Sequence, residues 1–184
     1  MRLAVSLILL TASGSGMYAA IVSLQPIAAE FGLSRAAASM PYFMTMIGFG
    51  LGGVVMGRLS DRIGRKPVLL ATLAANTVGY LMLAFVPNIW LAIAVRLFTG
   101  LGAGNISTVQ GYVADVTPPE QRAGRMGLIG AAFGLGFIAG PAIGGILAGA
   151  DLSATNFQLP AFAAAAFSGL ALILTLVTLK ESLS

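Results

Sequence analysis

The sequence predicts an all-α membrane protein whose helices cross a lipid bilayer. Of its 184 residues, 58% are hydrophobic and 9% are charged, whereas soluble domains carry about 25% charged residues. Long apolar stretches alternate with short connectors that hold most of the charges, which indicates that lipid is the solvent. No stretch shows the apolar/polar alternation of a membrane β-barrel. Helices are therefore the expected spanning elements.

Six stretches are long enough to cross, since a membrane-spanning helix needs about 20 mostly apolar residues. They cover residues 3–29, 36–57, 67–86, 89–113, 125–149 and 159–180 of a single domain, 1–184. The first stretch begins like a signal peptide, with Arg2 before an apolar run and small residues at 12–14. However, the run continues to about Ala29, which is longer than a signal peptide requires. We therefore expect it to remain as the first span.

The basic residues predict the orientation, because cytoplasmic connectors carry an excess of Lys and Arg. With six spans, most of the basic residues share one side; Arg35 flanks a span on the other side and Arg96 lies within the fourth span. We expect a multi-pass protein of the plasma (inner) membrane with both termini in the cytoplasm. The basic residues on the cytoplasmic side are Arg2, Arg58, Arg62, Arg65, Lys66, Arg122, Arg125 and Lys180.

Glycines recur at four-residue spacing in the second and fifth spans, as at positions 48/52 and 136/140/144. Such rows form a smooth groove that lets another helix backbone approach closely. A general abundance of Gly in membrane helices is the alternative, but rows this dense favour helix packing. Because the two spans hold equivalent places in two three-helix units, the pattern favours two inverted three-helix repeats.

The composition excludes several kinds of site. The chain has no Cys and no His, which removes disulfides, zinc sites of the Cys type and the side chain that usually titrates near neutral pH. The net charge of +4 follows from membrane topology, so we expect no nucleic-acid partner. The letters G-x-G-x-x-G occur at 48–53, but a dinucleotide site needs a preceding strand, and these glycines lie inside an apolar span. We expect no cofactor, no metal and no enzymatic activity.

The segment from 57 to 66, GRLSDRIGRK, carries a specific motif. It matches G-x-L-x-D-R-x-G-R-K and resembles the loop between helices two and three of major facilitator superfamily transporters. A topogenic charge cluster would explain the basic residues but not Asp61 or the two glycines. The matching residues are Gly57, Leu59, Asp61, Arg62, Gly64, Arg65 and Lys66.

This resemblance implies a cytoplasmic gate and the N-terminal half of a major facilitator fold. In the family, the matching Asp meets a helix N-terminus of the other half, and a matching Arg meets an acidic residue that ends helix four. Carried over to this sequence, Asp61 would cap a partner helix, and Arg65 would pair with Asp115. The cluster would hold the cytoplasmic side closed in one state and separate in the other.

Two further segments resemble the same family. Residues 96–103 resemble the helix-four pattern R-x-x-Q-G-x-G-A, with Thr99 in place of Gln. Residues 112–182 resemble tetracycline-type drug efflux antiporters, whereas the second span looks rather more like bacterial monocarboxylate-type members. The helix-five pattern associated with antiporters, G-x-x-x-G-P-x-x-G-G, is matched at Gly136, Gly140, Pro141, Gly144 and Gly145.

A charge inside the fourth span is costly, at about 2.5–3.5 kcal/mol on insertion scales. Arg96 would lie about two turns from the non-cytoplasmic surface, and snorkelling to nearby headgroups is the alternative to a functional role. We expect Arg96, together with Gln25 and Asn105, to line a central cavity for a small-molecule substrate.

Two departures from the family pattern bear on function. No acidic residue occurs between 3 and 29, where drug exporters often carry one, so proton coupling within these helices is in doubt. The family's complete chain has about twelve helices in two halves related by an axis along the membrane normal. A second copy or a separate C-terminal half would therefore complete the pathway.

Two functions remain open. One is transport of a small organic solute by alternating access, with efflux by proton antiport, as a dimer or with a C-terminal half. The alternative is a non-transporting half-transporter fragment or a membrane assembly subunit. The sequence does not name the substrate.

Overall fold

The computed structural model describes residues 32, 34–149 and 158–182, and the regular structure within them is entirely helical. The first predicted span, 3–29, with its candidate residue Gln25, lies outside the described residues. The helices are α3 (Arg35–Ile63), α4 (Arg65–Leu83), α5 (Ile89–Ala103), α6 (Ile106–Asp115), α7 (Pro119–Ala148) and α8 (Gln158–Thr178).

Among the described residues, five helical segments are long and apolar enough to cross a membrane. They correspond to the second to sixth predicted spans, with α5 and α6 together forming the segment Ile89–Asp115. Large apolar side chains such as Phe43, Trp90 and Ile146 are exposed around the bundle. A bilayer would cover such a surface, because only helices with internally satisfied backbones are stable against lipid.

The helices extend beyond the apolar stretches, and the connectors are shorter than expected. Residues 58–66 were expected as a connector, but α3 continues to Ile63 and α4 begins at Arg65. Likewise, α6 ends at Asp115 and α7 already begins at Pro119. The length of an apolar stretch reflects the thickness of the hydrocarbon layer. The helix itself can continue beyond this stretch into the headgroup region, where its side chains are charged.

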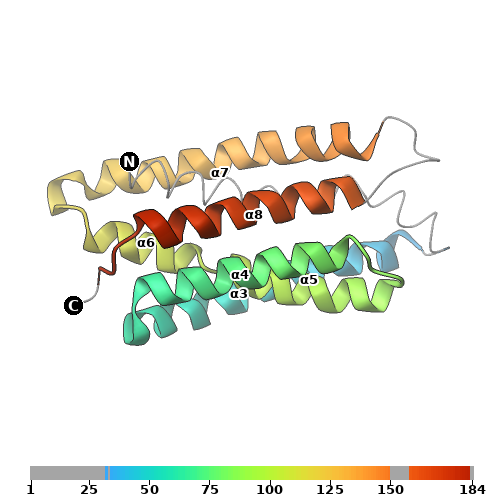
Figure 1. Ribbon diagram of the computed structural model, residues 1–184, viewed down its shortest axis with the longest axis horizontal. Coiled ribbons are helices and arrows are strands. Elements are labelled where there is room, and N and C mark those ends of the chain that lie inside the picture. Colours follow the sequence, from blue (N-terminus) through green and yellow to red (C-terminus); the bar gives the residue numbers. More distant parts are fainter. Residues whose placement is uncertain (1–31, 33, 150–157, 183–184) are drawn as a thin grey trace.

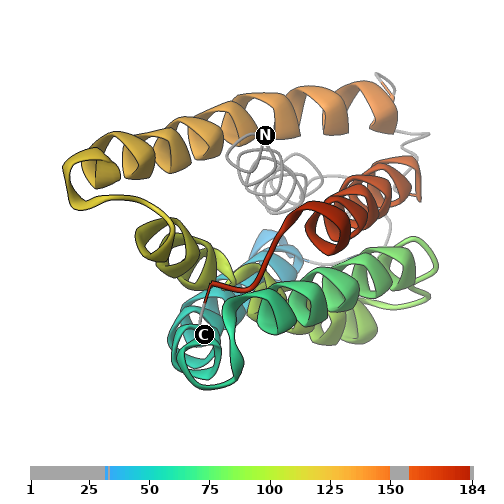
Figure 2. The same cartoon turned by 60° about the vertical axis from the view of Figure 1, so that its left-hand side comes forward.

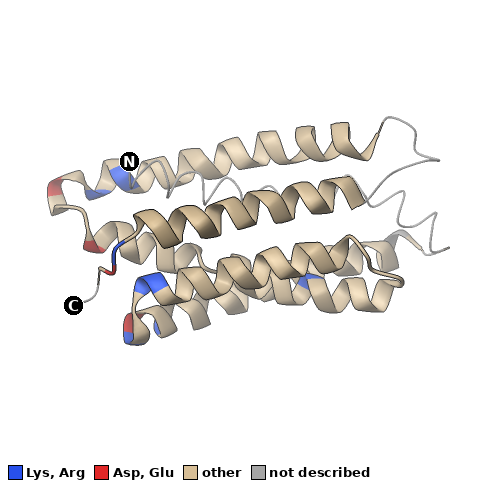
Figure 3. Ribbon diagram, viewed as in Figure 1, with Lys and Arg blue, Asp and Glu red and all other residues tan. Residues whose placement is uncertain are grey.

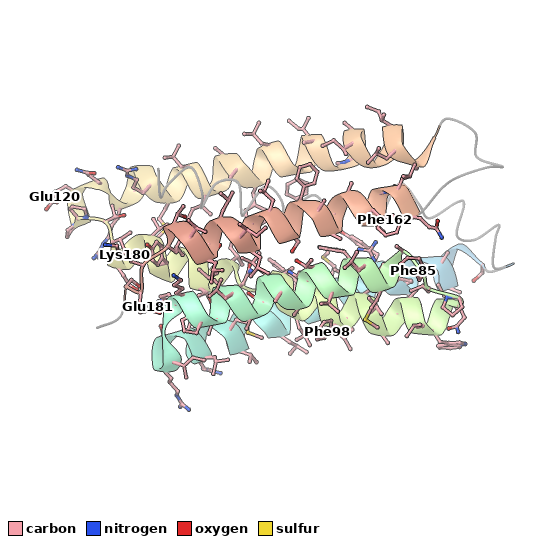
Figure 4. All side chains as sticks on the ribbon, in the orientation of Figure 1. Phe85, Phe98, Glu120, Phe162, Lys180 and Glu181 are labelled. Carbon is pink, nitrogen blue, oxygen red and sulfur yellow. The ribbon has the colours of Figure 1, made fainter. Side chains whose placement is uncertain are left out.

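The helices form an elongated bundle (Figure 1), in which α3 packs mainly against α5 and α4 mainly against α8. At one end of the α4–α8 contact, Phe85 and Phe162 meet edge to face with ring centroids 5.6 Å apart (Figure 4). Among the described helices, α7 packs mainly against α6 and α8, and it lies along one margin of the bundle in Figure 2. The buried core joins α4, α6, α7 and α8.

Glycines bring α3 and α5 into backbone contact. A Cβ on Gly52 would overlap the carbonyl group of Leu101, and one on Gly48 would overlap the carbonyl of Leu97. Conversely, a Cβ on Gly100 would overlap the backbone of Thr45. The glycine row of the second span thus serves close helix packing, as expected, on one face of the helix.

The predicted fourth span, 89–113, lies within the single candidate span Ile89–Asp115, whose regular helix is interrupted by one tight turn. Between α5 and α6 the chain makes a tight turn at Gly104 and Asn105, with ψ angles near zero. The amide of Asn105 bonds back three residues, to Gly102, at 3.2 Å. Gly104 lies against the backbone of Gly52 and Gly53, where a side chain would not fit.

Candidate functional site

The predicted motif forms the turn between α3 and α4 at one end of the bundle. Figure 3 shows that most charged residues of the described chain gather at this end. Gly64 links the two helices with φ +105° and ψ 154°, a conformation that favours Gly. Its amide bonds the carbonyl of Ser60 at 3.2 Å, which closes α3. The next residue, Arg65, therefore starts α4 and turns back along α3.

Arg65 holds the site together. Its Nη1 lies 2.6 Å from the carboxylate of Asp61 and donates to the hydroxyl of Ser60 at 2.7 Å. Its Nε donates to Asp115 at the end of α6, at 3.0 Å. The guanidinium lies over Gly111, where an added Cβ would come within 2.6 Å of its central carbon. The structure thus forms the Arg65–Asp115 pair that the resemblance implied.

Exposure distinguishes the two carboxylates. The side chain of Arg65 is 11% exposed, that of Asp115 is 29% exposed and that of Asp61 is 61% exposed. The inner pair is shielded from solvent, whereas Asp61 presents most of its surface outward. A solvent-exposed ion pair contributes little to stability, so Asp61 is available for a second partner. Its expected role as the cap of a partner helix stays a prediction.

Glu181 is a site residue that the sequence did not reveal. Its carboxylate accepts hydrogen bonds from the backbone amides of Arg65 at 2.9 Å and Lys66 at 3.1 Å. These amides are unpaired donors at the start of α4, and the helix dipole favours a negative charge there. Figure 4 places Glu181 and Lys180 beside the start of α4. No local motif marks this contact, because the partners lie 116 residues apart.

The segment after α8 is fixed by further contacts. Ser182 donates to Asp115 at 3.1 Å, and Lys66 donates to the carbonyl of Leu176, near the end of α8, at 3.0 Å. A cation at a helix C-terminus is favourable, just as an anion at the N-terminus is. The start of α4 and the end of α8 therefore stabilise each other. The site joins the end of α3, the start of α4, the end of α6 and the residues after α8.

The remaining motif residues are peripheral in this structure. Leu59 and Arg62 are exposed, and Gly57 lies against the side chain of Ser107, 3.3 Å from the position of an added Cβ. The structure therefore brings together Asp61, Gly64, Arg65, Lys66 and Asp115, and it leaves the other motif positions at the rim.

The candidate cavity residues do not form one described site. Arg96 is partly buried in α5 and interacts electrostatically with Tyr80 of α4. Asn105 is 3% exposed, and its carboxamide donates to Thr72 of α4 at 3.1 Å. Asn105 thus belongs to a helix contact in this structure, and its expected cavity-lining role stays a prediction.

The antiporter-type segment lies within α7. Gly136, Gly140 and Gly144 are buried, while a Cβ on Gly145 would meet open space. Pro141 lies inside the continuous helix Pro119–Ala148. Nearer the start of the same helix, a Cβ on Gly127, Gly130 or Gly134 would also meet open space. Ile138, one turn after Gly134, is 74% exposed on the same side of α7, so this side carries both open glycines and an apolar side chain.

Comparison with known proteins supports one family. The profile of the Major Facilitator Superfamily matches residues 4–183. The chain is 36% identical over 167 residues to the class C tetracycline resistance protein of Escherichia coli, covering 91% of this chain and 39% of that protein. It is 40% identical over 128 residues to the class E protein of Escherichia coli, covering 70% and 30%.

A solved structure shares the fold. The bacterial homolog of the human lysosomal transporter Spinster, in an inward-facing and occupied conformation, superimposes with a TM-score of 0.84 at 18% identity. This match covers 98% of the present chain and 44% of that chain. The chain therefore spans less than half the length of these relatives. By its sequence profile, its identity to tetracycline resistance proteins and its fold, the chain belongs to the Major Facilitator Superfamily.

Proposed function

We propose that this chain supplies the N-terminal half of a transporter that exports a small organic solute across the plasma membrane by alternating access. The observation that carries the proposal is the Arg65 cluster, which joins the ends of α3, α4 and α6. Such a cluster lies at the place where the resemblance expects a cytoplasmic gate. The relatives named tetracycline resistance proteins support tetracycline as the first solute to test.

The geometry suits a contact that forms and breaks. Partly exposed ion pairs contribute about 0–1 kcal/mol, and the inner pair is only partly shielded, with Asp115 29% exposed. A two-state equilibrium shifts by no more than the differential binding free energy of the solute. A weak, geometrically specific cluster is therefore easier to open than a fully buried one.

The chain matches 39% of the length of a whole relative, and we propose that a further half completes the pathway. A second copy or a separate C-terminal half would provide it. Two features of the described surface could receive such a partner. The side chain of Asp61 is 61% exposed at the end of α3, and Gly50 and Gly53 face open space on the same helix. Helices with small residues on the surface pack closely in membranes.

We further propose that export is coupled to protons. The support is the antiporter-type pattern in α7 together with the tetracycline-type relatives. The carboxylates of the described chain lie at helix ends or in connectors, as do Asp115 and Glu120. The proton-binding group therefore belongs either to a carboxylate of the Arg65 cluster, such as Asp115, or to the partner.

Transport into proteoliposomes tests the proposal, with tetracycline fluorescence as the readout and an imposed pH gradient as the driving force. We expect Asp61→Asn and Arg96→Ala each to reduce uptake at least tenfold, whereas Glu120→Gln should leave it unchanged. Glu120 is a matched control because it is an exposed carboxylate outside the cluster. Uptake that is independent of Asp61 and Arg96 would reject both assignments.

The second candidate function is a non-transporting half or a membrane assembly subunit. The mass of the purified chain in nanodiscs distinguishes between these two candidate functions. A dimer supports self-assembly and justifies the transport assay on the chain alone. A monomer without uptake supports the second candidate unless coexpression with a C-terminal half restores uptake.

A further inference from the structure

The side chain of Asn76 contains a buried polar atom without a partner. Asn76 lies in the middle of α4 at 1% exposure, and its Oδ1 accepts no hydrogen bond from the described part of the chain. An unpaired buried acceptor is unfavourable because it has lost its water. Native structures keep few such groups, and each needs a physical reason. The reason lies in the helix opposite.

The broken fourth span faces Asn76. A Cβ on Gly102, in the last turn of α5, would overlap the amide oxygen of Asn76. Three residues later, Asn105 bonds Thr72, which precedes Asn76 by one turn on the same face of α4. Side chains four residues apart on a helix lie about 5–6 Å apart at Cβ. The carboxamide of Asn105 thus has two hydrogen-bond acceptors within a turn of each other, and one is vacant.

The regular helix is interrupted at this place. Gly104 and Asn105 separate α5 from α6, and no side chain caps the start of α6. Asn105 bonds Thr72 with its side chain while its own backbone forms the break. A rotamer change of the Asn105 side chain, with a small axial shift of α6, can therefore exchange one acceptor for the other without disturbing α5.

We propose that Asn105 is a two-position hydrogen-bond switch, with Thr72 as its acceptor in this structure and Asn76 Oδ1 as its acceptor in a second state. The first state leaves Asn76 unpaired, and the second frees the hydroxyl of Thr72, which retains its own bonds to the carbonyls of Val68 and Leu69. At the Asn105 side chain each state therefore has one hydrogen bond, so the exchange of acceptors itself loses none.

The switch acts on the gate through α6. Asp115 ends this helix and lies 3.0 Å from Arg65, so an axial shift of a few ångströms separates the pair. Ser107 and Thr108, which bond the carbonyls of Gly53 and Met56 on α3, move with it. The inference rests on the proposed function for the role of this pair as a gate, whereas the two hydrogen-bond positions can be measured without transport.

The absence of native cysteine allows a background-free test. Val109→Cys places a reporter in α6 at a 3% exposed core position, and Ala171→Cys places a control reporter in α8 at a 0% exposed position. The rate of alkylation by N-ethylmaleimide is measured for each in nanodiscs. The test variants are Thr72→Val, which removes the first acceptor, and Asn76→Leu, which removes the second. Thr72→Ser, which keeps the hydroxyl, is the conservative control.

The switch predicts effects of opposite sign at the α6 reporter. Thr72→Val should raise alkylation at position 109 about three- to tenfold, the effect of losing one hydrogen bond, and Asn76→Leu should lower it by a similar factor. Thr72→Ser and the reporter at position 171 should not change. An increase, or no change, with Asn76→Leu overturns the proposal, as does a parallel rise at both reporters, which indicates general loosening. If alkylation behaves as expected and transport is still absent, the proposed function fails while the switch stands.

Discussion

Removing the carboxylate of Glu181 should loosen the start of α4. This carboxylate accepts from the amides of Arg65 and Lys66 at 2.9 and 3.1 Å. Hydrogen bonds to charged groups contribute about 1.5–3 kcal/mol, and loss of a helix cap costs about 0.5–2 kcal/mol. Because Glu181 is exposed, solvent screening weakens the interaction. We expect Glu181→Ala to lower the local stability of this turn by about 1–2 kcal/mol.

Hydrogen–deuterium exchange in nanodiscs measures this local stability. A loss of about 1–2 kcal/mol corresponds to about a 5–30-fold change in an opening equilibrium, so the amides of Arg65 and Lys66 should exchange faster by that factor. Glu181→Gln should give an intermediate result because it keeps a carbonyl acceptor without the charge. Glu120→Ala is the matched control, since Glu120 is an exposed acid in the first turn of α7.

The comparison between the two amides and the rest of α4 decides the outcome. Faster exchange confined to the first turn supports a capping role. If Glu181→Ala leaves both amides within about twofold of the unaltered chain, the carboxylate does not stabilise the helix start, and the reasoning is refuted. Equal acceleration along all of α4 would refute it too, because a cap acts on the first turn.

Three other substitutions have defined outcomes. Gly52→Ala should destabilise the chain by about 1–3 kcal/mol because its Cβ would overlap the Leu101 carbonyl. Gly53→Ala should not destabilise it, because Gly53 faces open space. Thermal unfolding in detergent compares the two variants. Gly64→Ala should cost about 1–3 kcal/mol in the same assay because φ is +105° at this turn, and an unchanged midpoint would contradict the strain. Arg65→Lys should uncouple the cluster, since an ammonium lacks the fork that reaches two partners, and a cysteine introduced at 113 should then alkylate faster.

The spans could be predicted from the sequence because the bilayer imposes one length on every crossing helix. The helix ends could not, since the apolar signal stops where the headgroups begin. In α3 the helical conformation persists through Asp61 and Arg62 to Ile63, and Gly64 ends it with its positive φ. The glycine that ends the helix was visible in the motif, but the motif was interpreted as an extended connector.

The site was predictable where its residues are adjacent in the sequence or fixed by the family pattern. Arg65 and Asp115 form the implied pair at 3.0 Å. Glu181 was not predictable, because its contact with the start of α4 depends on how α4 and α8 pack. The sequence shows an acid after the sixth span, but many membrane proteins carry charges there, so its position alone carried no information about a partner.

The polar residues inside the spans show why composition alone does not locate a substrate cavity. A polar side chain in a membrane helix is expensive unless it is satisfied or functional, and both Asn105 and Asn76 lie within spans. Asn105 is satisfied by Thr72, so it joins two helices and needs no solute to justify it. The Oδ1 of Asn76 has no hydrogen-bond partner among the described residues, although Asn76 lies one turn from Thr72 on α4. If both residues served static packing, Leu at 76 would be the more stable choice, because an apolar residue leaves no acceptor unpaired. An unpaired acceptor beside a broken helix therefore argues for a second arrangement of that helix, in which the same atom is used.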